Sequence, residues 1–447
     1  MHRLLVAGVA VVAVLTGFAA GAGPDSAHAL PAVACKTGSV AAVVGGRHVC
    51  LNGGQRCRRA LDGRYHRYGF HCHASGRLTR SKPSSSPRPV KLSVAGPQQV
   101  VFDWSNDRCE DLDIPDLPAR AFRDASGNVQ LISAHFRNRR FIGPDLDHLS
   151  HPCSLILNSD GSADPGAFDD GEWIASTYTS DGQTVYALVH DEYHGWEHPG
   201  QCPSNPSGFT IACWYNAVTL ATSTDGGATY ADQPQPRVVA SVPYRYVPDH
   251  GPLGMFTPSN IVLNPADNNY YALVYLNLHG PRVGTCLIRT RNLADPTSWR
   301  AWSGGRSFDT SFIDPYRSYD DPSVHLCMPL SHSGPGDMQP GSLTYSTVAR
   351  QWLWIGQAVG GAYYSLSPDL INWRAPELFF PAQVTWDYQC GDGDPIAYPS
   401  LIDPAGTSRN FETVGNTAYL YYTQFHYTDC GQTLDRDLVR VPITISG

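Results

Sequence analysis

One pattern of strands and turns recurs five times along this chain, and it restricts the folds that the chain can adopt. The clearest copy spans 256–302, where apolar runs at 261–263, 270–276 and 286–290 are separated by polar turns. Short β-rich runs that are joined by turns and end on an aromatic residue are typical of one antiparallel meander. The other four copies begin at Pro118, Glu172, Gly341 and Ala397. Self-similarity on this scale predicts a β-propeller, here with five blades.

The composition supports an all-β fold. The 447 residues include 42 Gly, 35 Pro, 23 Tyr and 10 Trp, which favours short strands and tight turns over helices. A strand at 100–104 precedes the first repeat, and we expect it to pair with the last blade, at 419–425 or 438–445, and so close the ring. The formal net charge of −8 argues against nucleic acid as a partner.

The chain divides into four segments by composition. Residues 1–29 have the basic start, the apolar core and the small-residue cleavage motif of a secretory signal peptide, with a membrane anchor as the alternative. Residues 30–78 form a small Cys-containing module, 79–91 a Pro- and Ser-rich linker, and 92–447 the five-bladed propeller. We therefore expect a secreted, extracellular monomer with no membrane span after cleavage of the signal.

All 12 cysteines follow the predicted signal, and in an exported protein they are expected to form disulfides. No Cys-x-x-Cys pair occurs, so a zinc or iron–sulfur site has little support. Two disulfides are expected within the small module at 30–78, because so short a chain cannot be stabilised by burial alone. Proximity along the propeller favours four pairs: Cys202 with Cys213, Cys390 with Cys430, Cys109 with Cys153, and Cys286 with Cys327.

The small module carries basic and aromatic residues between 58 and 68, among them Arg58, Arg59 and Tyr65. Such residues could contact a cell-wall polymer. The alternative is a disulfide-stapled spacer with a solvated basic face.

Polar residues are expected to gather at one mouth of the propeller, where inner strands begin and second strands end. The starts of the inner strands supply Asp116, Arg120, Arg123, Glu172, Asn260 and Asp394. The ends of the second strands supply His135, Asn138, His190, Glu192, His194, His279 and His426. Hydrolysis of a glycosidic bond requires groups of this kind: one carboxylate activates water, one carboxylic acid protonates the leaving oxygen, and polar groups hold the sugar hydroxyls.

These features resemble the five-bladed propeller glycoside hydrolases of the arabinanase and β-xylosidase group and of the invertase and levansucrase group. The segment YYSLSPDLINW at 363–373 is similar to their Ser-x-Asp-Leu-x-x-Trp blade ending. The segment STDGGATY at 223–230 is similar to the Asp-box turn of sialidases and other propellers, which implies the fold but not the reaction. The chain departs from these enzymes in lacking the invertase start Trp-x-x-Asp-Pro-Asn, the Glu-Cys acid motif and a sialidase arginine triad.

The resemblance implies roles for three carboxylates. Asp116 precedes the first inner strand, so it is the candidate for the general base or a fixed carboxylate, with a loop cap as the alternative. Glu192 and Glu172 compete for the role of the acid. Glu192 is flanked by His190 and His194 at alternating positions, which point to one side of an extended segment. Glu172 precedes its inner strand as Asp116 does.

The other polar residues of the mouth are candidates for substrate binding. Arg120 and Arg123 alternate along the first inner strand, where they would bind the sugar or neutralise Asp116. Four histidines end second strands at equivalent positions, and they are either rim residues or a ring that grips a sugar or a metal: His135, His190, His279 and His426. The resemblance also implies room for a central calcium, although we expect no cofactor to be required and assign no residue as a metal ligand.

The sequence therefore favours a glycoside hydrolase that acts on an extracellular polysaccharide or oligosaccharide, with furanose-containing polymers among the candidate substrates. The alternative is a non-catalytic, lectin-like propeller that binds carbohydrate. Similar polar residues at every blade would favour the lectin. The blades differ at these positions, which favours a single central site.

Overall fold

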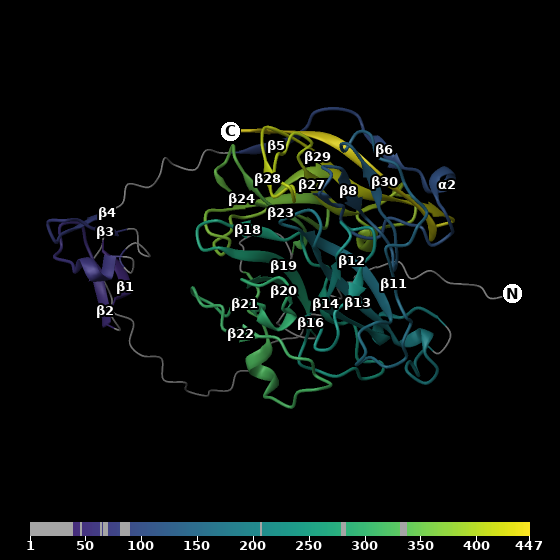
Figure 1. Ribbon diagram of the computed structural model, residues 1–447, viewed down its shortest axis with the longest axis horizontal. Coiled ribbons are helices and arrows are strands. Elements are labelled where there is room, and N and C mark those ends of the chain that lie inside the picture. The colour runs from purple at the N-terminus through teal and green to yellow at the C-terminus, as the bar shows by residue number, and fades with distance from the viewer. Residues whose placement is uncertain are drawn as a thin grey trace. The chain divides into compact units, whose positions relative to one another are not determined.

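The computed structural model describes residues 39–44, 47–62, 65, 70–80, 90–205, 208–278, 283–330 and 338–447 (Figure 1). The described residues before 81 form one compact unit, and Val90–Gly447 form the other. The predicted signal at 1–29, most of the predicted linker at 79–91 and His279 lie outside the described residues. No helix within the described ranges is both long and apolar enough to cross a membrane.

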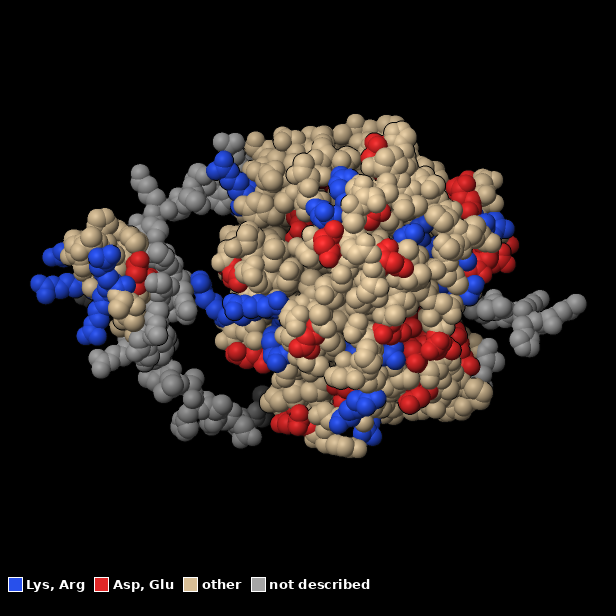
Figure 2. All heavy atoms as spheres, in the orientation of Figure 1, with Lys and Arg blue, Asp and Glu red and all other residues tan. Residues whose placement is uncertain are grey.

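The small unit consists of two hairpins around a compact apolar core. Strand β1 (Val40–Val44) pairs with β2 (Arg47–Leu51), and β3 (Phe70–Cys72) pairs with β4 (Leu78–Arg80); a 3-10 turn, η1, covers Arg59–Leu61. The Cys57–Cys72 disulfide crosses this unit. Tyr65 belongs to the core, with 7% of its surface exposed, so it is not part of the basic face expected from the sequence. Arg58 and Arg59 are exposed, and Figure 2 shows basic side chains on this unit.

The large unit is almost entirely β-structure, as the composition predicted. Its only described α-helix is α2 (Trp104–Asp107), which is four residues long. Single 3-10 turns punctuate the loops: η2 (Gly195–Glu197), η3 (Ile211–Cys213), η4 (Pro296–Ser298), η5 (Pro322–His325) and η6 (Thr385–Asp387).

The strands form meanders in chain order. The first contains β7 (Arg120–Arg123), β8 (Val129–Ile132) and β10 (Phe141–Gly143), followed by the pair β9 (Arg137–Asn138) and β11 (Leu157–Asn158). The next contains β12 (Gly171–Tyr178), β13 (Val185–His194), β14 (Trp214–Ser223), β15 (Ala231–Asp232) and β16 (Val238–Ala240). It continues through a parallel pairing of β14 and β17 (Leu253–Phe256) into β18 (Val262–Asn264), β19 (Asn269–Asn277), β20 (Gly284–Thr290), β21 (Arg300–Ala301) and β22 (Thr310–Ser311).

Two five-stranded sheets complete the large unit. One contains β23 (Gln339–Ser346), β24 (Gln351–Ala358), β25 (Gly361–Ser367), β26 (Glu377–Pro381) and β28 (Thr413–Val414). The other contains β27 (Ile396–Ile402), β29 (Thr417–Thr428), β30 (Gly431–Ser446), β5 (Lys91–Val94) and β6 (Gln99–Phe102).

The two ends of the large unit meet in one sheet, as the sequence predicted. Strands β5 and β6 pair antiparallel with β30, and Phe102 lies opposite Leu438. Figure 1 shows the blue strands β5 and β6 beside the yellow β30. Pairing the first strands with the last strand covers two sheet edges that would otherwise be exposed.

Arg120 connects the innermost segments of the meanders. Its guanidinium donates to the carbonyl oxygens of Ala175, Pro258 and Gly341 and to the hydroxyl of Ser400, at 2.7–3.3 Å. Two of these carbonyls lie at β-bulges, because the ladders of β12 and β23 skip Ala175 and Gly341. A Cβ atom at Gly341 would lie 2.0 Å from the carbonyl oxygen of Pro399, so this close approach requires glycine.

The four disulfides expected from proximity in the large unit are confirmed. The structure contains Cys109–Cys153, Cys202–Cys213, Cys286–Cys327 and Cys390–Cys430. The Asp-box segment forms the structural turn that was expected, in which Asp225 accepts hydrogen bonds from the backbone N–H and the hydroxyl of Thr229. These disulfides are consistent with an extracellular protein.

Candidate functional site

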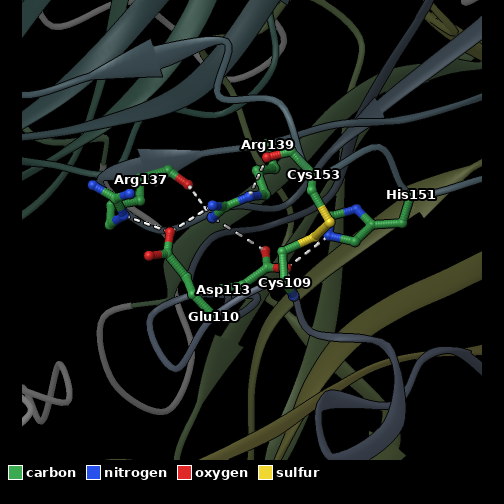
Figure 3. The surroundings of a disulfide bond; sticks show 7 residues. All are labelled: Cys109, Glu110, Asp113, Arg137, Arg139, His151 and Cys153. Carbon is green, nitrogen blue, oxygen red and sulfur yellow. Dashed lines mark hydrogen bonds and ion pairs between the residues drawn. A yellow bond between two sulfur atoms is a disulfide. The ribbon is translucent and has the colours of Figure 1, made fainter.

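Asp116 lies just before β7 in a loop that is held in place from several sides. The Cys109–Cys153 disulfide ties the start of this loop to the segment that precedes β11 (Figure 3). Glu110 forms ion pairs with Arg137 and Arg139. Asp113 accepts from His151 Nε2 at 2.8 Å. On either side of Asp116, the carbonyl oxygens of Pro115 and Leu117 accept hydrogen bonds from the hydroxyls of Thr423 and Ser133.

The carboxyl group of Asp116 is buried among polar side chains that come from distant parts of the chain. Oδ1 accepts hydrogen bonds from Arg436 and, at 3.3 Å, from the hydroxyl of Tyr398. Oδ2 has no hydrogen-bond partner in the described structure and lies 3.8 Å from His135 Nε2. Burial raises the pKa of Asp116 to about 6, and the negative charge of Glu192 adds to the shift, while Arg436 opposes it. Asp116 therefore exchanges its proton near neutral pH.

Glu192 lies on β13 and is held by three aromatic side chains. Its Oε2 accepts from His194 Nε2 at 2.9 Å and from Trp214 Nε1 at 3.1 Å. Its Oε1 lies 3.5 Å from His190 Nδ1. His190, Glu192 and His194 alternate along the strand, so the shared face expected from their spacing is confirmed.

The three histidines around the two carboxyl groups differ in charge. Burial lowers the pKa of His135 and of His190, so both are neutral at physiological pH. For His194, burial acts in the same direction, but hydrogen bonds to Glu192 and Glu197 outweigh it and raise the pKa to about 10. His194 is therefore positively charged across the neutral range.

We call this cluster the central site. It comprises Asp116, His135, Trp173, His190, Glu192, His194, Trp214, Tyr398 and Arg436. The rings pack against one another, since Trp173 lies 5.2 Å from the His135 ring and 5.8 Å from the His194 ring. The site thus combines two carboxyl groups with aromatic walls and several hydrogen-bond donors.

A pocket lies beside the central site. It is lined by Pro118, Phe256, Thr257, Tyr275, Gln339, Pro340, Gln357, Trp386, Ala397 and Tyr398. Two of these residues also touch the site, because Tyr398 donates to Asp116 and Thr257 Oγ1 lies 3.5 Å from His190 Nδ1. Asp116 and Glu192 are 1% and 4% exposed and lie behind this wall. Of the residues expected at the mouth, Asp116, His135, His190, Glu192 and His194 come together beside this pocket.

Tyr398 has an unusual backbone conformation. Its φ is +63°, at an irregularity in the pairing of β27 with β29 between Ala397 and Ser400. A bulky residue with positive φ is rare and costs roughly 1–3 kcal/mol, which is a cost often found at functional sites. The conformation is held by a 2.8 Å hydrogen bond from Tyr398 N to the Gln357 side chain. This bend places the phenol between the pocket and Asp116.

The structure separates Glu172 from the central site. Glu172 pairs with Asp191 in the ladder of β12 and β13, whereas the next residue, Trp173, pairs with His190. Successive side chains of a strand point to opposite faces, so Glu172 and Glu192 lie on opposite faces of this sheet. Glu172 instead lies near Asp232 and Arg237, and burial together with the charge of Asp232 raises its pKa to about 10.

Arg120 and Arg123 do not neutralise Asp116, in contrast to one of the two roles expected from the sequence. The described hydrogen bonds of Arg120 go to Ser400 and to carbonyl oxygens. Arg123 donates to the carbonyl oxygen of Gly406 and lies over the Phe411 ring. The cation that pairs with Asp116 is Arg436, 320 residues away along the chain.

Two asparagines that were candidates for sugar binding connect neighbouring strands instead. Asn138 accepts from Ile174 N and donates to the carbonyl oxygen of Glu172. Asn260 accepts from Leu343 N and donates to the Leu343 carbonyl oxygen. Both amides are therefore occupied by backbone groups.

His426 and Asp394 form a separate cluster at the surface. His426 Nδ1 and Nε2 lie 2.8 and 2.9 Å from Asp394 and Asp437, and these two contacts raise the pKa of His426 against the effect of burial. Asp437 follows Arg436 on β30, so it points away from the central site. Together with Asp435, His426 and Asp437 place three potential ligand atoms within 4.8 Å of one another. The described residues contain two other groups of three potential metal-ligand atoms, and both groups include cysteines that form disulfides.

Four residues of the central site were not singled out from the sequence. Tyr398 and Arg436 depend on strand pairing across the whole chain, which leaves no local signal. Trp173 and Trp214 were indistinguishable from the many aromatic residues that fill the sheets. Trp173 lies opposite His190 and Trp214 lies opposite His194 in the strand ladders. These pairings identify the two tryptophans as site residues only once the register is known.

Several solved structures are similar to this chain. No family model and no curated protein matches it. One similar structure is a thermostable family-43 glycoside hydrolase, with 10% identity, a TM-score of 0.39, and coverage of 75% of this chain and 96% of that one. A family-43 protein of Bacillus licheniformis has 12% identity and a TM-score of 0.41, with coverage of 75% and 56%. An endo-arabinase of Bacteroides thetaiotaomicron has 12% identity and a TM-score of 0.31, with coverage of 57% and 71%.

These structures belong to the class that the sequence resembles. At TM-scores below 0.5, the function of this chain has to be argued from its own side chains.

Proposed function

We propose that the chain is a secreted glycoside hydrolase whose central site cleaves a neutral or furanose-containing oligosaccharide or polysaccharide. The observation that carries the proposal is the pair of carboxyl groups beside one pocket, Asp116 and Glu192, each held by its own set of hydrogen-bond partners. We also propose that the large unit is a five-bladed propeller. Its axis would pass near Arg120, which hydrogen bonds to segments of the other four meanders.

Asp116 is suited to activate water. Its Oδ1 is occupied by Arg436 and Tyr398, while Oδ2 has no hydrogen-bond partner in the described structure and can accept a proton. With a pKa of about 6, Asp116 is ionised at neutral pH and is still basic enough to take a proton. In the proposed step, water gives its proton to Oδ2 as its oxygen bonds to the anomeric carbon.

The pair of Glu192 and His194 is suited to supply the second proton. Because the pKa of His194 is about 10, this pair carries a proton at neutral pH. As the glycosidic bond breaks, the His194 imidazolium passes its proton through the Glu192 carboxylate to the leaving oxygen, and His194 is left neutral. If water lies between the two carboxyl groups, their separation is expected to be about 6.5–9.5 Å, and the anomeric configuration inverts.

The pocket supplies groups that fit a sugar. Gln339, Gln357 and Thr257 offer amides and a hydroxyl, and Trp386 and Tyr275 offer aromatic surface for a sugar ring. No lining residue is charged, so a neutral sugar fits better than an acidic one. To reach Asp116, the sugar has to displace the Tyr398 phenol from the wall.

A non-catalytic, lectin-like function is the second candidate, and the burial of the two carboxyl groups favours it. Asp116 and Glu192 are only 1% and 4% exposed, so a sugar could occupy the pocket without touching either group. In that case the two carboxyl groups would only stabilise the fold.

The exposed arginines of the small unit, such as Arg58 and Arg59, would in either case contact an anionic cell-wall polymer.

Release of reducing sugar from arabinans, xylans, fructans and microbial arabinogalactans tests the proposal. We expect wild-type protein to act on at least one polymer. Asp116→Asn and Glu192→Gln should each lower kcat by roughly 10²–10⁴-fold, because each removes one proton-transfer group. Circular dichroism would show that the variants are folded. Retention on a polymer without any release by the wild type would instead establish the lectin-like function.

A further inference from the structure

A second pocket lies on the face of the β13–β14 hairpin that is opposite to the central site. Its wall includes Asp191, Tyr193, Tyr215, Phe168, Tyr244 and Tyr316. Asp191 and Tyr193 are two residues apart on β13, and Asp191 lies opposite Ala217 on β14. Strand alternation therefore directs Asp191, Tyr193 and Tyr215 to the same face, away from His190 and Glu192.

Asp191 is a buried carboxyl group in the wall of this pocket, and one of its two oxygens lacks a hydrogen-bond partner among the described residues. It is 3% exposed, and its Oδ1 makes no hydrogen bond within the described residues. A buried polar group without a partner costs roughly 1–3 kcal/mol, and buried carboxylates are normally paired. The central site does not use Asp191, because it points to the other face. A ligand in the pocket would supply the missing partner.

The charges around Asp191 are mainly negative. Asp170, Asp169 and Asp232 each raise its pKa, in addition to the larger effect of burial, whereas Arg237 is the one cation that lowers it. Arg237 is already engaged, with Nη1 3.2 Å from Asp232 and 3.9 Å from Glu172. His198 is paired with Asp170 at 2.9 Å. A cation in the pocket would therefore stabilise the ionised form of Asp191, which burial and the acidic neighbours disfavour.

The wall of the pocket suits an organic cation better than a metal ion. Phe168 and Tyr316 meet edge to face at 5.8 Å, and Tyr215 packs edge to face on Tyr246 at 4.8 Å, so the rings are held in place. Aromatic faces attract ammonium groups through their quadrupoles. A calcium ion would require 6–8 oxygen ligands, but Asp191 belongs to none of the described groups with three potential ligand atoms close together.

We propose that this pocket, at Asp191, binds a small organic cation, namely an ammonium group carried by a ligand. The charged nitrogen pairs with the Asp191 carboxylate, and its methyl or methylene groups contact the tyrosine rings. The site is separate from the central site, and its occupation does not depend on whether the chain cleaves sugars. Tyr244, which is 41% exposed, lies where the pocket opens to solvent.

Binding of tetramethylammonium and methylammonium chloride, measured by isothermal titration calorimetry on the full chain, tests this inference. Sodium chloride at equal ionic strength and tert-butanol, an uncharged molecule of similar shape, serve as controls. We expect saturable binding of at least one ammonium probe, a loss of about tenfold or more in affinity for Asp191→Asn, and a smaller loss for Tyr244→Ala. Glu192→Gln should bind as the wild type does.

Three results would overturn the inference. The first is the absence of saturable binding by either ammonium probe. The second is equal binding of tert-butanol, which would show an apolar pocket without charge selection. The third is unchanged affinity in Asp191→Asn, for which circular dichroism would confirm folding. Because Tyr244 is largely exposed, Tyr244→Ala keeps the inference testable even if Asp191→Asn does not fold.

Discussion

At the scale of single residues, the side of a strand to which a carboxyl group points decides its environment. Glu172 and Glu192 lie on neighbouring strands, β12 and β13, and both are buried. Glu192 meets His194 and Trp214, which donate hydrogen bonds to it. Glu172 meets other carboxyl groups, and its pKa is raised to about 10. These environments predict different outcomes for the same Glu-to-Gln change.

We expect Glu172→Gln to retain its activity and to gain stability at alkaline pH. The pKa of Glu172 is above its unfolded value of 4.5, so its contribution to stability is complete below pH 4.5 and is lost as the pH rises toward 10. Glutamine cannot ionise, so the free energy of unfolding at pH 9 should rise by about 1 kcal/mol or more. Urea unfolding at pH 5 and pH 9, with Glu192→Gln as the matched variant, measures this change. A loss of activity in Glu172→Gln would place it in the catalytic machinery.

A second residue-scale prediction concerns Tyr398 and the pH profile. The Tyr398 hydroxyl donates to Asp116 and lowers the pKa of that carboxyl group. In Tyr398→Phe the pKa of Asp116 should rise above about 6. The proposed base is then ionised only at higher pH, so the acidic limb of kcat/KM should move upward, by up to about 1 pH unit. Tyr388→Phe, at a tyrosine that makes no described hydrogen bond to Asp116, is the control. An unchanged or downward-shifted limb would contradict the role of Asp116 as base.

The sequence predicted part of the central site. Asp116 and the alternating residues His190, Glu192 and His194 could be found because the local pattern places them before one strand or along one face of another. Arg436 could not, because its contact with Asp116 depends on pairing between the first and last meanders. The competition between Glu172 and Glu192 likewise required the register of β12 against β13, which the sequence does not contain.

At the scale of elements, the pairing of β6 with β30 links the start of the large unit to its end. The sequence contained enough information for this pairing, because a lone β-rich run before the first repeat needs a partner. Phe102 at the end of β6 is 2% exposed and lies 5.8 Å from the Phe141 ring and 5.1 Å from the His151 ring. Val100 on the same strand is 57% exposed.

We expect Phe102→Ala to lower the free energy of unfolding by roughly 3–5 kcal/mol, because it leaves a cavity where the first and last strands meet. The matched variant Val100→Ala should change it by no more than about 0.5 kcal/mol, since the side chain is exposed. Urea unfolding followed by tryptophan fluorescence measures both. Similar effects of the two substitutions would show that this strand pairing contributes little to stability.

At the scale of the whole molecule, Arg120 is a buried cation that no described carboxylate neutralises, and carbonyl oxygens from several meanders surround it instead. The repeats of the sequence predicted that the inner strands would converge, but the residue at their centre was assigned to the site rather than to the framework. The β-bulges at Ala175 and Gly341 turn their carbonyl groups toward Arg120, and a sequence pattern does not show bulges of this kind. The convergence of distant segments on one side chain therefore became visible only in the structure.

This arrangement predicts that Arg120→Lys destabilises the whole large unit. Lysine has three donors on one nitrogen and cannot reach carbonyl groups on several sides as the planar guanidinium does. At least two of the carbonyl groups of Ala175, Pro258 and Gly341 would lose their bond, at roughly 1–3 kcal/mol each. We expect a single cooperative loss of at least about 2 kcal/mol in urea unfolding, whereas Arg123→Lys, a change at a half-buried arginine with one described side-chain hydrogen bond, should cost less than about 1 kcal/mol. Equal effects of the two substitutions, or unfolding of one meander alone, would contradict a framework centred on Arg120.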